Sequence, residues 1–357
     1  MKPKKLSDMR KGIDRIDDRI VKLINERGKI SHAIGESKKQ KGQPLYSPDR
    51  ESLVYSKIAK RNSGPLKEES LKSVYSEIMS ACLSLEKSLV VAYLGPELTF
   101  THQAAIRKFG SSMEYISCDS IANVFREVEK GNADYGVVPI ENSTEGAVNY
   151  TLDMFAKSSL KICSETFLPI RHSVLSKSSN VKSIKKIYSK AEVFGQCRSW
   201  IEKNLPGAKL HSVASTSKAA QIVAKESKAA CIASELVSKK YKLKVIARAI
   251  EDSATNVTRF LIIGDHISKL SGKDKTSIMF SVKDRPGVLH DMLTPFKKAG
   301  INLTKIESRP SKKKAWKYYF FLDMEGHCQA PRVEKTLKDL KKKCHFLKIL
   351  GSYPSGR

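Results

Sequence analysis

The sequence predicts a multidomain protein. It has an all-α domain over residues 1–88, a two-lobed, doubly wound α/β domain over 90–267, and an α+β ferredoxin-like domain over 275–352. Apolar residues in the first part alternate in threes and fours, as one face of a helix requires. The middle part alternates short β-branched runs with helical stretches. The last part follows the order strand-helix-strand-strand-helix-strand.

Composition limits the classes of protein that fit this chain. At 357 residues and 40% hydrophobic content, the chain can bury a core in each domain. No apolar run approaches the roughly 18 residues of a membrane span, and the opening MKPKKLSDMRKG lacks the apolar centre of a signal peptide. We therefore expect a cytoplasmic protein without a membrane partner. Seven cysteines without a C-x-x-C pair argue against a disulfide framework and a zinc site, so no metal is expected.

The net charge of +28 raises nucleic acid as a partner. The lysines, however, are spread in short groups along the whole chain, without interleaved aromatic residues or a known nucleic-acid motif. We favour a solvated basic surface that attracts small anions, and keep a nucleic-acid site as the weaker alternative.

One long helix is predicted from Leu6, and its apolar stripe is interrupted by Arg27. The members of the stripe are Leu6, Met9, Ile13, Ile16, Ile20, Leu23, Ile30 and Ile34. A buried guanidinium needs an anionic partner to offset its desolvation. That partner is either a core carboxylate or a ligand, and Arg27 by itself leaves both open.

The neighbours of Arg27 along the helix favour a ligand and a second chain. Lys38 lies about three turns further on and can reach the same ligand. Arg10 is roughly 25 Å from Arg27 along the helix, so it can join them only from a second, antiparallel chain. A helix of some 35 residues is also too long for one small domain to cover. Both observations predict an entwined homodimer, and whether dimers pair further stays open.

Two shorter helices are predicted in SPDRESLVYSKIAKR and EESLKSVYSEIMSACLSLEKSL. Ser47 is expected to cap the first, with Pro48 at its first position. In the second, Cys82 and Glu86 continue an apolar row at spacings of four. Glu86 therefore offers a carboxyl group on an apolar face, where a protonated form can donate a hydrogen bond.

These stretches resemble the all-helical chorismate mutase family over essentially all of residues 1–88. The resemblance implies that Arg27 and Arg10 of the partner subunit bind the two carboxylates of chorismate, while Lys38 and Glu86 donate to its ether oxygen. The further implied pocket residues are Arg50, Glu51, Ser47 and Cys82. The implied reaction is a pericyclic rearrangement to prephenate, which needs neither a nucleophile nor a cofactor. The family often has Asp in place of Ser47, and some members have Gln in place of Glu86.

In the middle domain, strands are predicted in VVAYLG, YGVVPIEN, KKIYS, AACIAS, KVIARAI and RFLIIG. Several strands lead into polar clusters that begin helices: TFTHQAA, ENSTEGAVNY and STSKAAQIV. Backbone amides at helix starts bind carboxylates, and ligands collect at the carboxyl ends of parallel strands. Ordinary capping is the simpler interpretation of each cluster alone. Their recurrence, together with a polar Thr258 and Arg259 at the mouth of an apolar strand, favours a ligand site.

This segment resembles the prephenate dehydratase family, in order, through YLGPELTFTHQAA, VPIENSTEGAV, LPIRHSVL, QCRSW, STSKAA and IEDSATNVTRFLIIG. The resemblance implies that Thr258 is the principal catalytic residue in a cleft between two lobes. The other implied catalytic positions are Asn142, Ser189 and Gln196. The implied substrate-binding positions are Glu141, Ser143, Thr99, Thr101, Ser215, Thr216, Arg259 and Phe260.

The implied reaction converts prephenate to phenylpyruvate with loss of carbon dioxide and the ring hydroxyl. Thr258 would help the hydroxide to leave, as a general acid or hydrogen-bond donor. Leu98 stands where the family usually has glycine, and SKAE replaces a common Ser-His-Pro run. Both departures leave the local loop geometry open.

The last domain resembles the ACT regulatory domain of the same enzymes. The residues that carry this resemblance are Gly287, Val288 and Leu289 in one motif, and Glu307, Ser308, Arg309 and Pro310 in the other. The implied ligand is L-phenylalanine, bound at a dimer interface as an allosteric inhibitor. Val288 replaces the usual alanine, which leaves the affinity open.

Together the three resemblances predict a bifunctional enzyme that converts chorismate through prephenate to phenylpyruvate under feedback inhibition by L-phenylalanine. The alternative is a non-enzymatic sensor of amino acids or small anions, because two-lobed and ferredoxin-like folds also serve as binding proteins. Arg27, Lys38 and Thr258 favour the enzyme.

Overall fold

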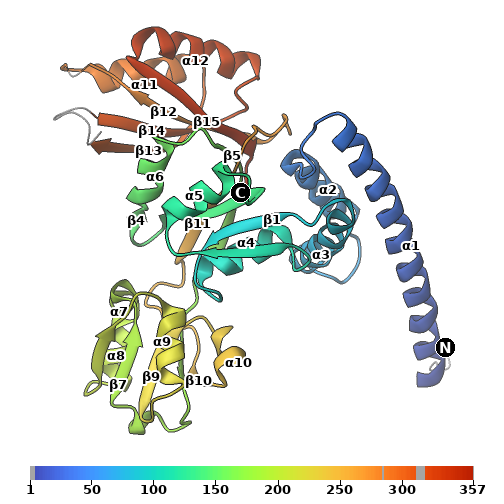
Figure 1. The fold of residues 1–357 in the computed structure, drawn as a ribbon, viewed down its shortest axis with the longest axis vertical. Helices are drawn as coiled ribbons and strands as arrows, with labels where there is room; N and C mark the ends of the chain where they lie inside the picture. The colour runs from blue at the N-terminus through green and yellow to red at the C-terminus, as the bar shows by residue number, and fades with distance from the viewer. Residues whose placement is uncertain (1–4, 284, 311–317, 357) are drawn as a thin grey trace. The chain divides into compact units, whose positions relative to one another are not determined.

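A computed structural model describes residues 5–283, 285–310 and 318–356. Contacts divide the chain into two units, Met1–Leu89 with Arg107–Glu114, and Val90–Ile106 with Tyr115–Arg357. The first unit is built on helices, and the second contains three β-sheets (Figure 1).

The helical unit contains α1 (Leu6–Gln40), α2 (Pro48–Arg61) and α3 (Glu68–Glu86). All three helices were predicted, and α1 continues for 35 residues without a break. Glycine lets α3 approach α1, because a Cβ atom at Gly35 would lie 2.6 Å from Cγ of Glu86. The described residues leave the apolar stripe of α1 exposed: Ile13 and Ile30 are 57% and 64% exposed.

The first sheet has the strand order β2-β1-β3-β11-β5, with β4 paired to β3. Its strands are β1 (Val90–Leu94), β2 (Glu114–Cys118), β3 (Tyr135–Asn142), β4 (Gly146–Ala147), β5 (Lys161–Pro169) and β11 (Val257–Gly264). The connecting helices are α4 (Phe100–Phe109), α5 (Ile121–Glu129) and α6 (Asn149–Phe155). β1 and β3 are parallel, whereas β11 runs antiparallel to both β3 and β5. This return strand places Thr258 opposite Asn142.

The second sheet forms the other lobe, with the order β10-β6-β9-β7-β8. Its strands are β6 (Ser173–Ser176), β7 (Lys186–Ser189), β8 (Lys209–Ser212), β9 (Ala229–Ala233) and β10 (Lys244–Ala247). Its helices are α7 (Ala191–Gln196), α8 (Arg198–Asn204), α9 (Thr216–Val223) and α10 (Val237–Tyr241), with a 3₁₀ turn η1 at Val181–Ser183. This sheet is also mixed, because β7 is parallel to β8 and β9, whereas β6 is antiparallel to β9 and β10.

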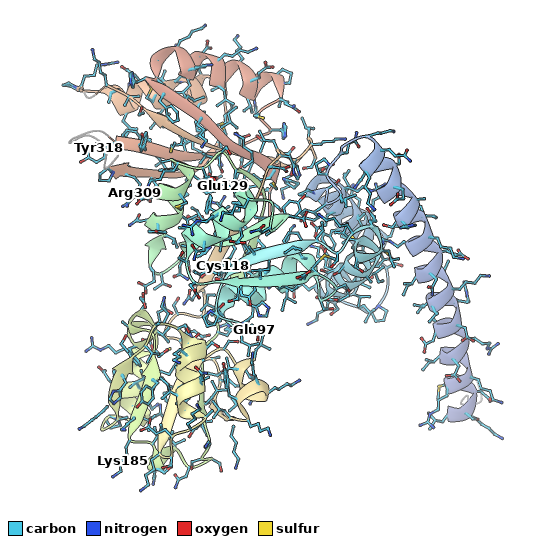
Figure 2. All side chains as sticks on the ribbon, in the orientation of Figure 1. Glu97, Cys118, Glu129, Lys185, Arg309 and Tyr318 are labelled. Atoms are coloured by element: carbon cyan, nitrogen blue, oxygen red, sulfur yellow. The ribbon has the colours of Figure 1, made fainter. Side chains whose placement is uncertain are left out.

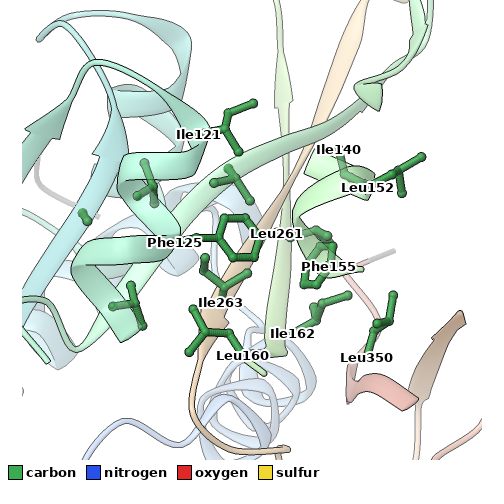
Figure 3. Close-up of a cluster of buried hydrophobic side chains, with 14 of the residues drawn as sticks. Ile121, Phe125, Ile140, Leu152, Phe155, Leu160, Ile162, Leu261, Ile263 and Leu350 are labelled. Atoms are coloured by element: carbon green, nitrogen blue, oxygen red, sulfur yellow. The ribbon is translucent and has the colours of Figure 1, made fainter. Parts of the chain in front are cut away.

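The third sheet has the order β13-β14-β12-β15, and all its neighbours are antiparallel. Its elements are β12 (Asp274–Ser281), α11 (Val288–Lys298), β13 (Leu303–Pro310), β14 (Tyr318–Glu325), α12 (Pro331–Lys343) and β15 (Phe346–Pro354), which confirms the ferredoxin-like order. One core of this domain joins Phe280 to Phe296 and Leu337 from the two helices. A second core continues into the first lobe, where Leu350 of β15 belongs to the same cluster as Phe155 (Figure 3).

All seven cysteines are free thiols, five of them buried. Over the described ranges, no helix has both the length and the apolar composition of a membrane span. Within those same residues, no group of His, Cys, Asp and Glu side chains has the arrangement of a metal site.

Candidate functional site

The first candidate site lies where α1 packs against the end of α3. Glu86 is buried there, and its Oε1 accepts a hydrogen bond from Ser31 Oγ at 2.7 Å. Its Oε2 is buried and has no hydrogen-bond partner among the described residues, and the same holds for Nη1 of Arg27. Buried polar atoms are nearly always paired in folded proteins. These two atoms are therefore open to a ligand, which favours a ligand over a core carboxylate as the partner of Arg27.

The packing of α1 on α3 places Glu86 between Arg27 and Lys38. Ser31 and Gly35, the two residues of α1 that Glu86 approaches, lie between them along the helix. The structure thus brings the carboxyl group of Glu86 from α3 to the stretch of α1 that carries the guanidinium of Arg27 and the ammonium of Lys38.

The segment before α2 is held to α1 by Lys38. Its Nζ donates to the backbone oxygen of Leu45 at 2.5 Å and to Ser47 Oγ at 3.3 Å. Ser47 occupies the N-cap of α2 as predicted, but its side chain makes no capping hydrogen bond and accepts from Lys38 instead. Lys38 is thereby directed toward the start of α2.

The other predicted residues of this site lie apart from Glu86 or have protein partners. Glu51 accepts hydrogen bonds from the Tyr46 hydroxyl at 2.7 Å and from Lys108 Nζ at 2.8 Å. Cys82 is buried, whereas Arg10 and Arg50 are exposed. Within one chain, the straight course of α1 keeps Arg10 about 25 Å from Arg27.

The second candidate site begins with the cross-strand pair of Thr258 and Asn142. Nδ2 of Asn142 donates to Oγ1 of Thr258 at 2.8 Å. Oδ1 of Asn142 accepts from the backbone N–H groups of Thr144 and Glu145 at 2.9 and 3.0 Å, which fixes the orientation of the amide. Because Oγ1 accepts from Asn142, the hydroxyl hydrogen of Thr258 is left to donate elsewhere.

A chain of amides connects this pair to the second lobe. Nδ2 of Asn142 also donates to Oδ1 of Asn256 at 2.7 Å, and Nδ2 of Asn256 donates to Oε1 of Gln196 at 3.2 Å. Gln196 ends α7, and its Nε2 donates back to Oε1 of Glu145 in the first lobe at 3.1 Å. The predicted residues Thr258, Asn142 and Gln196 therefore belong to one network that joins the lobes.

His172 joins this network through Gln196. Its Nε2 is 3.0 Å from Oε1 of Gln196, and since an amide oxygen can only accept, Nε2 carries the hydrogen. Nδ1 is buried without a hydrogen-bond partner among the described residues. Burial lowers the pKa of His172, although the hydrogen bond with Gln196 and the charge of Glu251 oppose that effect. His172 is thus a neutral imidazole near pH 7.

Three members of the network were missed by sequence reasoning: His172, Asn256 and Glu145. All lie within stretches that resemble the dehydratase family. Asn256 had a usable signal, because residues two apart on an extended chain share a face, and it stands two before Thr258. Glu145 resembles an ordinary residue at the start of a helix, and His172 resembles a buried core histidine.

Several predicted residues instead form hydrogen bonds with backbone groups. Ser189 is fully buried and donates to the oxygen of Ile232 at 2.7 Å. Ser215 caps α9 by accepting from Lys218 N at 3.0 Å, and Thr99 donates to the oxygen of Leu94 at 3.2 Å. Ser143 accepts from Val257 N and donates to Thr255 O, both at 3.0 Å, while Thr101, Thr216 and Phe260 are buried.

Arg259 and Glu141 differ from the expectation that they bind substrate. Side chains alternate along a strand, so Arg259 faces the opposite side of β11 from Thr258. Its guanidinium is 4% exposed and bonds to Glu165 at 2.6 Å, Glu141 at 2.9 Å and Asp323 at 2.6 Å. Burial alone would raise the pKa of Glu141, but the hydrogen bond from Lys305 and the charge of Arg259 lower it. Both groups are committed to protein partners.

The third candidate site lies at the start of α11. Gly287 has φ +77°, a conformation that glycine adopts without strain, and Val288 is the first residue of the helix. Leu289 is 39% exposed. A cavity of about 240 Å³ adjoins them, lined by Lys283, Arg285, Val288, Asp291, Met292 and Lys343.

The second of the two motifs that resemble the ACT domain lies at the same end of the sheet. β12 and β13 are both antiparallel to β14, so they are parallel to each other. The carboxyl end of β13, with Glu307, Ser308, Arg309 and Pro310, therefore lies at the end where α11 begins. β13 is an edge strand, and its Arg309, labelled in Figure 2, pairs with Asp153 of α6 at 3.5 Å. One chain therefore brings both motifs to the same end of the sheet.

Known protein families match three successive parts of the chain. The chain matches chorismate mutase type II over residues 9–87, prephenate dehydratase over 91–268 and the ACT domain over 276–342. It is 52% identical over 353 residues to a bifunctional chorismate mutase/prephenate dehydratase of Aquifex aeolicus, covering 98% of each chain. A relative of the same description from Neisseria gonorrhoeae is 42% identical over 349 residues, covering 97% of this chain and 96% of the relative.

Among solved structures, the chain is similar to a prephenate dehydratase from Arthrobacter aurescens in complex with L-Phe. The TM-score is 0.70 at 32% identity, over 75% of this chain and 90% of that one.

Proposed function

Because this chain belongs to the family of bifunctional chorismate mutase/prephenate dehydratases, we propose that the two sites described above carry out successive steps of phenylalanine biosynthesis. The helical unit rearranges chorismate to prephenate, and the two-lobed domain converts prephenate to phenylpyruvate.

At the mutase site, Arg27 binds a carboxylate of chorismate, and Lys38 and Glu86 hydrogen-bond to its ether oxygen. The observation that carries this assignment is a pair of buried atoms, Nη1 of Arg27 and Oε2 of Glu86, for which the described part of the chain offers no hydrogen-bond partner. Holding the substrate in a compact conformer and stabilising charge on the breaking C–O bond suffice for a pericyclic step. A millionfold acceleration requires about 8 kcal/mol, which these two effects can supply.

At the dehydratase site, Thr258 donates a hydrogen bond to the ring hydroxyl of prephenate, which departs as hydroxide while the carboxylate leaves as carbon dioxide. The hydrogen bond from Asn142 to Oγ1 carries this assignment, because it orients the hydroxyl and leaves its hydrogen to donate. Asn256, directly before β11, accepts from Asn142 and donates to Gln196 of the second lobe, so Gln196 holds Asn142 through Asn256.

A second copy of the chain completes the mutase site and the regulatory domain. Arg10 of the partner subunit reaches the carboxylate that Arg27 leaves free, and the exposed stripe of α1 forms the interface. L-phenylalanine binds at the start of α11 and lowers dehydratase activity, as an ACT domain beside a dehydratase suggests. A cytoplasmic location fits the seven free thiols.

Turnover of chorismate by single-residue variants tests both assignments. With Thr258→Ala, prephenate accumulates and phenylpyruvate formation falls by at least about a hundredfold, the scale of general acid catalysis. With Arg27→Ala, chorismate persists, but added prephenate is still converted. Thr166→Ala changes a threonine on the neighbouring β5 and serves as the control.

Undiminished phenylpyruvate formation by Thr258→Ala would refute its catalytic role. A wild-type protein that binds phenylalanine but consumes neither chorismate nor prephenate would support the sensor instead.

A further inference from the structure

Two consecutive residue pairs join β11 to β3 and face opposite sides of the sheet. Thr258 pairs with Asn142, and Arg259 pairs with Glu141. Because side chains alternate, the first pair lies on the side of the dehydratase network and the second on the opposite side. The register shifts directly after Arg259, so a β-bulge adjoins both pairs. Bulges re-aim side chains beside active sites, which makes this point of the sheet sensitive to how Arg259 is held.

Residues of the ACT domain enclose the Arg259 guanidinium. Nη1 donates to Oδ2 of Asp323 at 2.6 Å, and Nη2 donates to the Tyr353 hydroxyl at 2.9 Å. Ser277 Oγ donates to Oδ1 of Asp323 at 2.5 Å and lies 2.7 Å from the Tyr353 hydroxyl. Since Ser277 donates to Asp323, the Tyr353 hydroxyl donates to Ser277. These bonds form a closed ring that includes Arg259, Tyr353, Ser277 and Asp323.

The charges around this ring balance within the buried interface. Glu165 accepts from Nε of Arg259 at 2.6 Å and from Lys275 Nζ at 2.8 Å. Lys305 pairs with Glu141. The three cations are Arg259, Lys275 and Lys305, and the three carboxylates are Glu141, Glu165 and Asp323. Removing one partner leaves a buried charge without compensation, so each member constrains the others.

The strand that presents the effector motif also takes part in this cluster. Lys305 stands two residues before Glu307 on β13, and its side chain reaches Glu141, the residue before Asn142. Arg309 on the same strand pairs with Asp153 of α6. A change in the position of β13 is therefore transmitted to Glu141 through Lys305.

We propose that Lys305, Asp323 and Tyr353 of the ACT domain are positioning residues for the dehydratase reaction. By holding Glu141 and Arg259 on one face of the β3–β11 pair, they fix Asn142 and Thr258 on the other. Phenylalanine bound beside β13 then acts on the catalytic hydroxyl through Lys305 and Glu141, as a coupling between two sites requires. This inference rests on the proposed role of Thr258.

The test uses the full chain with Tyr353→Phe, Asp323→Asn and Lys305→Met, assayed on added prephenate. We expect dehydratase kcat to fall about tenfold or more with little change in KM, because a group that acts through Thr258 affects the transition state rather than ground-state binding. Calorimetry should still detect phenylalanine binding, while saturating phenylalanine inhibits the Lys305→Met variant less than wild type. Mutase turnover in the same chain should be unchanged.

Two matched variants separate positioning from loss of stability. Lys348→Met removes another lysine of the same interface, which donates to the backbone oxygen of Phe155 at 2.9 Å and lies outside the cluster. Tyr135→Phe removes a hydroxyl from a buried tyrosine elsewhere in the first sheet. Both controls should keep wild-type kcat and maximal inhibition, even where they lower Tm.

Tyr353→Phe removes a single oxygen atom. The proposal is overturned if this variant folds and keeps wild-type kcat, and if phenylalanine still inhibits Lys305→Met fully. The proposal would also be overturned if Lys348→Met lowered dehydratase kcat and inhibition as much as Tyr353→Phe, Asp323→Asn and Lys305→Met do. These results leave the proposed function intact, because that function fails separately if Thr258→Ala retains dehydratase turnover.

Discussion

At the scale of single residues, His172 makes a testable link between burial and pH. Its pKa is lowered from the usual 6.5 by burial, so the folded protein favours the neutral imidazole, whereas the unfolded chain takes up a proton near pH 6.5. The contribution of neutral His172 to stability is therefore fully present above that pH. It is lost as the pH falls below it, by at most about 1.4 kcal/mol per pH unit. Protonation would also place a hydrogen on Nδ1, which has no acceptor among the described residues.

We expect the free energy of unfolding, measured with urea, to fall more between pH 7 and pH 5 in wild type than in His172→Gln. The glutamine variant cannot take up the proton. His290→Gln changes an exposed histidine and should follow wild type. Equal pH dependence of all three proteins would contradict the assignment of a neutral, buried His172.

The sequence pointed to Thr258, Asn142 and Gln196 singly, but it did not reveal the network that joins them to His172, Asn256 and Glu145. Polar side chains at strand ends indicated Thr258 and Asn142, whereas their pairing depends on β11 returning antiparallel to β3. The same return directs Arg259 to the opposite face, which a list of polar residues near one strand end does not reveal. Its partner Asp323 lies 64 residues away in the sequence.

At the scale of elements, the contact of α1 with α3 predicts a loss of mutase activity in Gly35→Ala. The added Cβ would lie 2.6 Å from Cγ of Glu86, so α3 or Glu86 must move. Alanine favours a helix over glycine by about 1 kcal/mol, so the activity should fall without loss of helix content. We expect mutase kcat/KM to drop at least about tenfold, equivalent to 1.4 kcal/mol of transition-state stabilisation. Dehydratase turnover should be unchanged.

Gly12→Ala is the matched control, because it makes the same change on the same helix at a point where, apart from the neighbouring helix backbone, no described atom lies within 4 Å of the added Cβ. It should keep mutase activity. Normal mutase activity in Gly35→Ala would show that the close approach of the two helices is not needed for catalysis.

Elements with a simple apolar pattern could be predicted, and those that bury polar groups could not. The stripe of α1 and the β-branched runs of β3 and β11 gave correct elements. β5 was missed because KICSETFLP contains Glu165, which is buried only because Arg259 and Lys275 neutralise it. Such a strand is apolar in its environment rather than in its sequence, since the compensating charges come from other elements.

At the scale of the whole molecule, the exposed stripe of α1 indicates assembly. Ile13, Ile16, Ile20, Ile30 and Ile34 are each more than 45% exposed along one helix. Contiguous exposed apolar surface is typical of protein interfaces, which supports the proposal that a second copy packs here. If two copies of α1 pair antiparallel, Arg10 of the partner subunit lies near Arg27, and each mutase site takes residues from both chains.

Mixed dimers test this shared site. A dimer of one Arg10→Ala chain and one Arg27→Ala chain has one site with both arginines intact and one site with neither. Each variant alone should lack mutase activity, whereas refolding equal amounts together should restore about one quarter of the wild-type rate, because half the dimers are mixed and each has one working site. Mixing Arg27→Ala with Lys38→Ala is the control, since both residues belong to the same chain's site and no intact site forms. If mixed dimers are shown to be present but the first mixture regains no activity, each chain builds its mutase site alone. The apolar stripe of α1 would then serve assembly without serving catalysis.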